Sequence, residues 1–145
     1  MTTLNSYLTF NGNCIEVFNF YKSVFGGDFT YVGKFKDMPK DANIKINEND
    51  KEKIMHISLP ISENVVLMGC DTSEELVKNF IQGNNFSISI NLDNKEEAKR
   101  LFNGLSKNGK ITMPLNKTFW GSYFGMLTDQ FGIQWMVNLN DTDLD

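Results

Sequence analysis

Residues 122–138 read SYFGMLTDQFGIQWMVN, and residues 54–70 read IMHISLPISENVVLMGC. The later stretch has the form of a β-hairpin, in which an Asp-x-x-Gly turn separates two apolar runs. The earlier stretch aligns on it without a gap, and this alignment places Met68 at the position of Met136. The same hairpin therefore occurs twice, and the repetition predicts a chain built from two similar modules.

A strand opens each half of the chain. The stretches SYLTFNGN (6–13) and FSISINLD (86–93) alternate with a period of two residues, which is the period of a strand with two unlike faces. When the two stretches are aligned from their first residues, Tyr7 matches Ser87. Each opening strand runs directly into the start of a helix.

Both helices have recognisable starts and ends. Asn13 and Asp93 are predicted N-caps, and Glu16 and Glu96 follow three residues later, as in a capping box. Apolar residues then recur at helical spacing, which is typical of a helix that packs on a core. Each helix stops at glycine.

A returning strand is expected between each helix and its hairpin, near residues 29–35 in the first half and, in a shorter form, near residues 110–113 in the second. Each half then reads strand, helix, strand, strand, strand. This order predicts the α+β class. We expect tandem βαβββ modules that form a curved mixed sheet around a cleft, with the helices on the outer face.

The length fits one domain, residues 1–145. Within it we expect a first module at 5–71, a linker at 72–85 and a second module at 86–139. Thr72 or Ser73 is expected to cap a short helix in the linker.

Two further stretches are polar. Residues 36–53 predict a long surface loop, which is either a functional lid or a plain solvated excursion. The acidic tail NDTDLD (140–145) is expected to fray.

Composition excludes several classes of function. The net charge is −4 and the chain holds a single arginine, so the basic patch that nucleic-acid binding requires is missing. No apolar run approaches the roughly 20 residues that span a bilayer, and no signal peptide is recognisable. We therefore expect a cytoplasmic protein that binds neither nucleic acid nor membranes. Cys14 and Cys70 lack a CxxC spacing and are expected to be free thiols.

Alternation along the strands sorts the side chains into those that pack under the helices and those that line the cleft. Trp135 falls into the core set. The predicted ligand-binding cleft consists of Tyr7, Thr9, His56, Met68, Ser87, Ser89, Trp120, Phe124, Met126 and Met136. Ser58 has the same parity as His56. A register error of one residue would invert both sets.

At this point the chain resembles the vicinal oxygen chelate superfamily, which contains glyoxalase I, extradiol dioxygenases and bleomycin-binding proteins. Within it, the chain is most similar to PhnB-like proteins, which are also called 3-demethylubiquinone-9 3-methyltransferase-like. The resemblance rests on YLTFNGNCIEVFNFYKSVFGG (7–27), IMH (54–56), FSISI (86–90) and TMPLNKTFWGSYFGMLTDQFGIQWMV (112–137). It covers nearly the whole chain and implies the fold expected above.

Metal-dependent members of the superfamily take ligands from the first and last strands of each module. The matching positions here are Tyr7, Met68, Ser87 and Met136, and Met136 occupies the place of a glutamate. Magnesium, manganese, iron, nickel and zinc prefer carboxylate oxygen or imidazole nitrogen. Two methionines suit only a soft ion such as Cu(I), and cleft lining explains them better. We therefore expect neither a metal site nor a cofactor.

The single histidine, His56, is the candidate catalytic residue, as a general base or a hydrogen-bond donor. The alternative is a purely structural histidine. Its match in the second hairpin is Phe124, so the two modules are chemically unlike. The histidine shows no serine or cysteine pairing of the kind that a catalytic triad needs. The sequence also lacks a glycine-rich turn for S-adenosylmethionine.

An aromatic cluster, KTFWGSYFG (117–125), precedes the last hairpin. Aromatic residues of this kind line small-molecule pockets, and they are also enriched at dimer interfaces. The prediction is a metal-free protein, a homodimer, that binds a small apolar or aromatic molecule. Two alternatives remain open. One is a metal-dependent glyoxalase- or dioxygenase-type enzyme that uses His56 with Glu16 or Glu63. The other is a drug-sequestering protein without chemistry.

Overall fold

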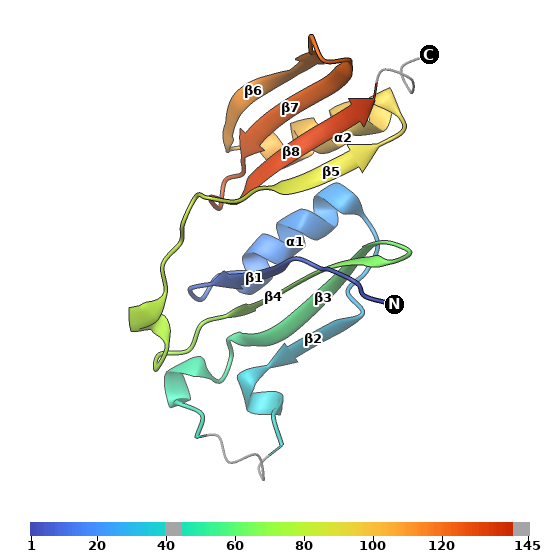
Figure 1. Cartoon of the computed structure of the whole chain (residues 1–145). Helices are drawn as coiled ribbons and strands as arrows, with labels where there is room; N and C mark the ends of the chain where they lie inside the picture. The colour runs from blue at the N-terminus through green and yellow to red at the C-terminus, as the bar shows by residue number, and fades with distance from the viewer. Residues whose placement is uncertain (40–44, 141–145) are drawn as a thin grey trace. The chain divides into compact units, whose positions relative to one another are not determined.

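The computed structural model describes residues 1–39 and 45–140. Contacts between Cα atoms divide the chain into two compact units, one up to Ile81 and one from Gln82 onward. Each unit contains one helix and one four-stranded mixed sheet. The predicted α+β class with two βαβββ modules is therefore confirmed, and the strands form two sheets rather than one continuous sheet (Figure 1).

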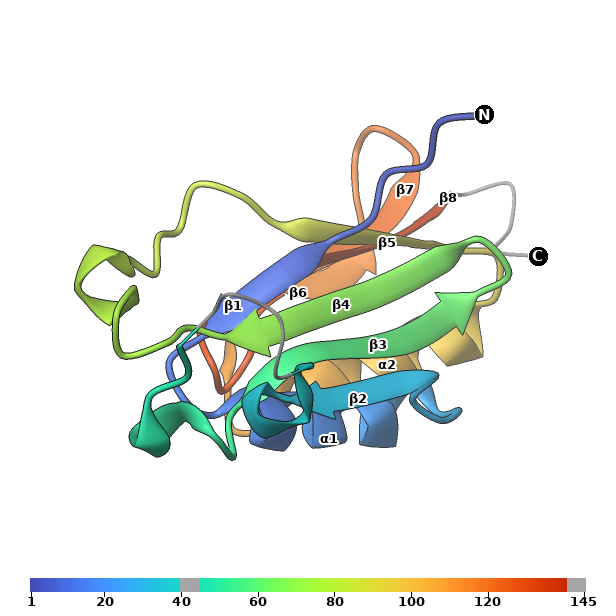
Figure 2. The same cartoon turned by 90° about the horizontal axis from the view of Figure 1, so that it is seen from below.

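The first unit consists of β1 (Tyr7–Phe10), α1 (Cys14–Phe25), β2 (Tyr31–Lys34), β3 (Ile54–Ser62) and β4 (Val65–Asp71). The strand order is β1-β4-β3-β2. Strands β1 and β4 are parallel, and the other two pairs are antiparallel. Helix α1 lies on one face of this sheet (Figure 2).

The second unit repeats this plan with β5 (Ile88–Leu92), α2 (Lys95–Ser106), β6 (Lys110–Lys117), β7 (Ser122–Thr128) and β8 (Gln134–Asn140). The strand order is β5-β8-β7-β6, again with one parallel pair, β5 with β8. Strand β6 is longer than the short strand that the sequence predicted. Helix α2 packs on its own sheet.

Each unit has a core between its helix and one face of its sheet. In the first unit, Phe10 meets the ring of Phe18 edge-on at 6.3 Å between centroids. In the second unit, Trp135 is buried, as predicted. The buried apolar residues of the strands are Leu8, Phe10, Ile54, Ile57, Leu59, Leu67, Leu127, Trp135, Val137 and Leu139, and Ile133 is buried just before β8 begins. Apart from Ile54, which an irregularity in the β2–β3 register separates from the rest of β3, residues that alternate with these in the strands therefore lie on the sheet faces that the helices do not cover.

The hairpin alignment agrees with the registers of the two sheets. Ser58 pairs with Met68 in the first unit, and Met126 pairs with Met136 in the second. The alignment of the opening strands is wrong by two residues. Tyr7 pairs with Met68, whereas the residue that pairs with Met136 is Ser89, not Ser87. A shift of two residues leaves every side chain on its predicted face.

Neither predicted capping box forms. The side chain of Asn13 makes no capping bond to α1, and the carboxylate of Asp71, at the end of β4, accepts hydrogen bonds from the amides of Gly12 and Cys14 instead. The second helix begins one residue later than predicted, because Asn94 rather than Asp93 caps it through the amide of Glu97.

The two connecting segments differ from the prediction in opposite ways, because the predicted loop contains more regular structure and the predicted linker contains less. The stretch 36–53 holds two short 3-10 turns, Phe35–Asp37 and Glu48–Asp50, and the side chain of Asp50 is buried. Residues 40–44 of that predicted loop and residues 141–145 of the predicted fraying tail lie outside the described residues. In the predicted linker, the expected helix is only a 3-10 turn at Val77–Asn79.

Candidate functional site

The uncovered face of the first sheet carries a row of side chains across all four strands. Tyr7 of β1 pairs with Met68 of β4, Met68 pairs with Ser58 of β3, and Ser58 pairs with Tyr31 of β2. This row faces away from α1, because a Cβ placed on the next residue, Gly69, would strike the ring of Phe18. The face therefore combines hydroxyl groups, a thioether and two aromatic rings.

A continuous chain of hydrogen bonds crosses this face. The hydroxyl of Tyr7 lies 3.0 Å from Nδ1 of His56, and Nε2 of His56 lies 2.9 Å from Oγ of Ser58. Both ring nitrogens of the only histidine are thus engaged, one on each side. A neutral imidazole carries one donor and one acceptor, so the chain has a direction that depends on the tautomer of His56.

Two tyrosine rings flank His56. The centroids of the Tyr7 and Tyr31 rings lie 5.5 and 5.7 Å from that of His56. The side chain of Tyr31 extends over Gly33, two residues further along its own strand. A Cβ placed on Gly33 would lie only 2.5 Å from the Tyr31 hydroxyl oxygen. Gly33 is the residue that pairs with His56. The absence of a side chain at Gly33 therefore makes room for the aromatic ring beside the imidazole.

The phenol of Tyr7 is a neutral group in this setting. Burial raises its pKa, and a hydrogen bond with the Cys70 thiol raises the pKa further. Cys70 itself contacts Thr9 only weakly, with Oγ1 and Sγ 3.9 Å apart. Tyr7 is nevertheless 47% exposed, whereas Ser58 is 9% exposed. Tyr7 is therefore the more accessible end of the chain.

The second sheet carries a different set on the equivalent face. Ser89, Met136, Met126 and Met113 form a row across β5, β8, β7 and β6. Irregularities in the β6–β7 register on either side of Met113 bring it opposite Met126. This face is dominated by three thioethers where the first sheet has hydroxyl groups.

The next row of the second sheet contains the position that matches His56. Phe124 occupies it, between Asn138 of β8 and Asn116 of β6. The amide of Asn138 donates to the side-chain oxygen of Asn91 at 3.2 Å. Trp120, in the turn before β7, meets the Phe124 ring at 5.8 Å between centroids. The aromatic cluster that the sequence singled out thus adjoins the apolar face of the second sheet.

The predicted site residues fall into two groups. Tyr7, Thr9, His56 and Met68 share the uncovered face of the first sheet, and Ser89, Phe124, Met126 and Met136 share that of the second. Trp120 adjoins the second group through Phe124, and Ser87 lies just before β5 begins. The shared cleft stays a prediction.

Sequence reasoning did not select Tyr31 as a member of the first group. It placed Ser58 on the same face as His56 but recognised no serine partner for that ring, although Ser58 is hydrogen-bonded to it. The sequence did contain a signal for the His56–Ser58 pair, because residues two apart in a strand point to the same face. Tyr31 offered no comparable local signal, since β2 reaches His56 only through its pairing with β3.

The residues at the metal-ligand positions of the superfamily do not fit a hard or borderline metal ion. With the register corrected, these positions hold Tyr7, Met68, Ser89 and Met136, none of which offers a carboxylate or an imidazole. Within residues 1–39 and 45–140, no three His, Cys, Asp or Glu side chains are grouped as metal ligands.

The alternative ligand set for a metal is not assembled either. Glu16 belongs to α1, which covers the face of the sheet opposite His56, and Glu63 lies in the turn beyond the end of β3. The two ring nitrogens of His56 are occupied by Tyr7 and Ser58.

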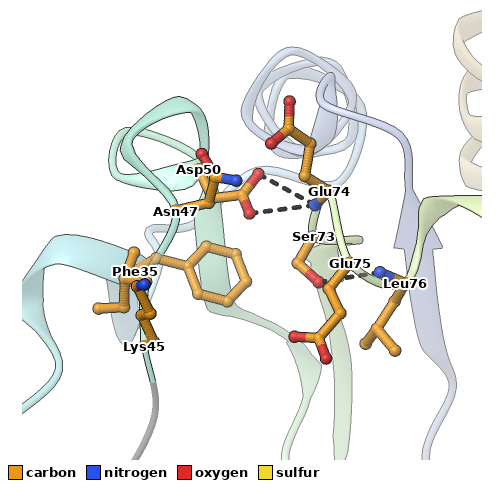
Figure 3. Close-up of a pocket in the computed structure, with 9 residues that line it drawn as sticks. Phe35, Lys45, Asn47, Asp50, Ser73, Glu74, Glu75 and Leu76 are labelled. Atoms are coloured by element: carbon orange, nitrogen blue, oxygen red, sulfur yellow. Dashed lines mark hydrogen bonds between the residues drawn. The ribbon is translucent and has the colours of Figure 1, made fainter.

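The structure also shows a pocket of about 840 Å³ away from the predicted site residues. It is lined by Phe35, Lys45, Ile46, Asn47, Asp50, Ser73, Glu74, Glu75 and Leu76 (Figure 3). The buried carboxylate of Asp50 accepts from the amide of Glu74 and from Nζ of Lys53. Burial alone would raise the pKa of Asp50, but these hydrogen bonds outweigh it and lower the pKa. Asp50 thus ties two segments of the wall together.

Comparison with known proteins agrees with this architecture. The model of the glyoxalase/bleomycin resistance protein/dioxygenase superfamily matches residues 3–137. The chain is also 34% identical to Protein YjdN of Escherichia coli (strain K12) over 139 residues, which cover 94% of each chain. The protein therefore belongs to the glyoxalase/bleomycin resistance protein/dioxygenase superfamily.

Solved structures of related proteins resemble this chain over nearly its whole length. The chain is 41% identical to protein PA1353 from Pseudomonas aeruginosa, with a TM-score of 0.79 over 97% of this chain and 98% of the other. The PhnB protein from Bacillus cereus has the same fold, with 24% identity and a TM-score of 0.73 over 95% and 99% of the two chains. No helix in the described part of the chain is long and apolar enough to cross a membrane.

Proposed function

We propose that this protein binds a small, largely apolar or aromatic molecule without the help of a metal ion. The observation that carries the proposal is the Tyr7–His56–Ser58 chain on the uncovered face of the first sheet, between two tyrosine rings. Binding sites for small molecules typically combine apolar and aromatic walls with a few well-placed polar groups. The first sheet supplies the polar groups and two of the rings.

The second sheet supports the same proposal. Met113, Met126 and Met136 present flexible, polarizable thioethers on one face, and such side chains adapt to apolar ligands and contact aromatic rings favourably. Trp120 is 53% exposed beside Phe124 and offers further aromatic surface. Both uncovered faces therefore suit an apolar or aromatic ligand, and the first also offers the imidazole of His56.

Two measurements test this function. Native mass spectrometry of the freshly purified protein should reveal a small molecule that is released on denaturation. A thermal-shift series with neutral aromatic compounds, p-nitroanisole among them, should raise the melting temperature of the wild-type protein. The stabilisation should fall in the His56→Phe variant, which introduces the residue that the second module already carries. A protein that neither retains nor is stabilised by any such compound would contradict the proposal.

The absence of a functional metal site is part of the proposal and has its own test. Isothermal titration with magnesium, manganese, nickel and zinc ions should show no stoichiometric site, because the ligand positions hold tyrosine, serine and methionine. A stabilising site of micromolar affinity would instead favour the metal-dependent enzyme.

We also expect a cytoplasmic homodimer. The exposed aromatic side chains Phe119 and Trp120 are of the type enriched in protein interfaces. Analytical ultracentrifugation of the full chain should give the mass of two copies, and a Trp120→Ser variant should weaken the association. A monomer at all accessible concentrations would contradict the dimer and leave the ligand proposal standing.

A further inference from the structure

We propose that the Tyr7–His56–Ser58 chain selects ligands that carry an acidic hydroxyl group, such as an acidic phenol, and accepts the proton of that group. The inference rests on the proposed function, because it specifies the chemical class of the molecule that binds on this face. It concerns only the first module, since the matching position in the second module is Phe124, which cannot take up a proton.

The geometry defines how a proton enters the chain. Ser58 is almost completely buried, whereas Tyr7 is 47% exposed, so Tyr7 is the more accessible of the two ends of the chain. The tyrosine hydroxyl lies 3.0 Å from Nδ1 of His56, within the range of a short proton transfer. On the far side, Nε2 of His56 has Ser58 as a partner at 2.9 Å. The imidazole is thus held in place at both nitrogens.

The transfer balances without any further reactant. The ligand hydroxyl gives its proton to the oxygen of Tyr7, and Tyr7 passes its own hydroxyl proton to Nδ1 of His56. Nε2 keeps its proton and donates it to Oγ of Ser58. The products are a ligand anion, a neutral tyrosine and an imidazolium. No bond between heavy atoms forms or breaks, and no group is oxidised or reduced.

The imidazolium of His56 provides the positive charge that faces the ligand anion. The open-face positions of the four strands are 7 and 9, 31 and 33, 56, 58 and 60, and 66, 68 and 70, and none of them holds Asp, Glu, Lys or Arg. The titratable groups that face His56 from the neighbouring strands are Tyr7 of β1, Tyr31 of β2 and Cys70 of β4. All three are neutral when protonated, so neither a fixed cation nor a fixed anion competes with the pair.

The strength of the base limits the ligand class. Histidine has an ordinary pKa of about 6.5 and a simple phenol one of about 10, so a simple phenol would favour the neutral pair roughly 3,000-fold. Transfer becomes favourable only for a hydroxyl whose acidity approaches that of imidazolium. Electron-poor phenols meet this condition, and neutral aromatic ethers and alcohols do not.

The test uses p-nitrophenol, whose acidity is close to that of imidazolium and whose anion absorbs visible light. The ligand control is p-nitroanisole, which has a similar shape but no acidic proton. At a near-neutral pH, at which substantial fractions of both free p-nitrophenol and free imidazole are neutral, adding the full-length protein should increase the phenolate absorbance. We expect the ratio of anion to neutral form to rise about tenfold, the equivalent of one pKa unit.

Variants separate proton transfer from binding. His56→Phe should abolish the extra phenolate absorbance, and Tyr7→Phe should reduce it while the aromatic surface for p-nitroanisole is kept. Tyr123→Phe, a tyrosine of β7 that contacts Lys95, is the matched control and should behave like the wild type. Thermal melting of each variant establishes that it is folded, and either of the first two suffices if the other does not fold.

The outcomes are distinguishable. If p-nitrophenol and p-nitroanisole bind equally well and no extra phenolate forms, the proton acceptor is refuted and the binding function stands. If extra phenolate forms equally in His56→Phe, the base is another group and the inference is also refuted. If neither compound binds, the proton acceptor is refuted, and the proposed function then depends on the wider thermal-shift series. Extra phenolate that depends on both His56 and Tyr7 supports the inference.

Discussion

The carboxylate of Asp71 accepts a hydrogen bond from the backbone amide of Cys14 at 2.9 Å, although the two residues are 57 positions apart in the sequence. The same carboxylate accepts from the amides of Gly12 and Ile54, both at 2.9 Å. It is 3% exposed. One side chain at the end of β4 therefore holds the turn before α1 and the start of β3 together.

Replacing Asp71 should destabilise the fold more than an ordinary cap mutation. Asp71→Ala leaves three backbone amides without their acceptor in a buried position, and we expect a loss of about 3 kcal/mol or more in the free energy of unfolding. Urea denaturation followed by circular dichroism measures it. Asn94→Ala is the comparison, because its side chain caps α2 through a single amide and should cost only about 1 kcal/mol. Equal losses in the two variants would contradict this account.

A second buried carboxylate organises the last hairpin. Asp129 accepts from the amides of Phe131 and Ile133, and its other oxygen accepts from Nε1 of Trp135 at 2.9 Å. Trp135→Phe should cost about 2 to 4 kcal/mol, because it removes a donor from a buried carboxylate and leaves unfilled volume in the core. Trp120→Phe is the control for the loss of an indole. Because Trp120 is exposed, this substitution should change the free energy of unfolding of the protein only slightly.

The pH dependence of stability should include a contribution from Glu52. The ammonium groups of Lys34 and Lys36 each lie 2.8 Å from its carboxylate, and their hydrogen bonds, that of Lys34 first, lower its pKa from 4.5 to about 2. Because the folded-state pKa is depressed, this contribution is fully present above pH 4.5 and disappears as the pH falls toward 2.

The Glu52→Gln variant should accordingly show a flatter loss of stability between those two pH values than the wild type. The carboxylate is exposed, so the difference should also shrink at high salt. Nuclear magnetic resonance titration of the Glu52 side chain gives the folded-state pKa directly. A value near the ordinary one would contradict the ion-pair arrangement.

The two cysteines should differ in reactivity. Cys14 is buried at the start of α1, and burial, together with the negative charge of Asp71, raises the pKa of its thiol. Thiolates rather than thiols react with iodoacetamide, so Cys14 should stay unmodified in the native protein. Cys70 is partly exposed and should be alkylated first. Peptide mass spectrometry after a timed reaction distinguishes them, and rapid native labelling of Cys14 would contradict its burial.

Much of the fold was predictable because the two hairpins repeat one pattern. Period-two alternation assigned Met68 and Met136 to the same faces that the structure shows, and the alignment error between Tyr7 and Ser87 did no harm to the face assignment, because it was a whole period. The helix starts were less predictable. Asn13 had the right residue type for a cap, but a carboxylate from a distant strand took that role.

The candidate site was likewise predictable from the sequence only in part. That His56 and Ser58 share a face follows from their spacing in one strand, and the sequence contained that information. That Tyr7 lies on the other side of the imidazole does not, because it depends on β4 lying between β1 and β3 in the sheet.

The sequence by itself determined the βαβββ repeat and the faces of the strands, because hydrophobic periodicity and turn residues are local properties of a chain. The resemblance of its motifs to known proteins indicated the superfamily. Only the tertiary structure decided which polar groups from distant parts of the chain meet, as with Asp71 and Cys14 or with Tyr7 and His56. Such contacts join residues that are 49 or more positions apart in the sequence. Their partners are chosen by strand order and register, which no local stretch of the sequence specifies alone.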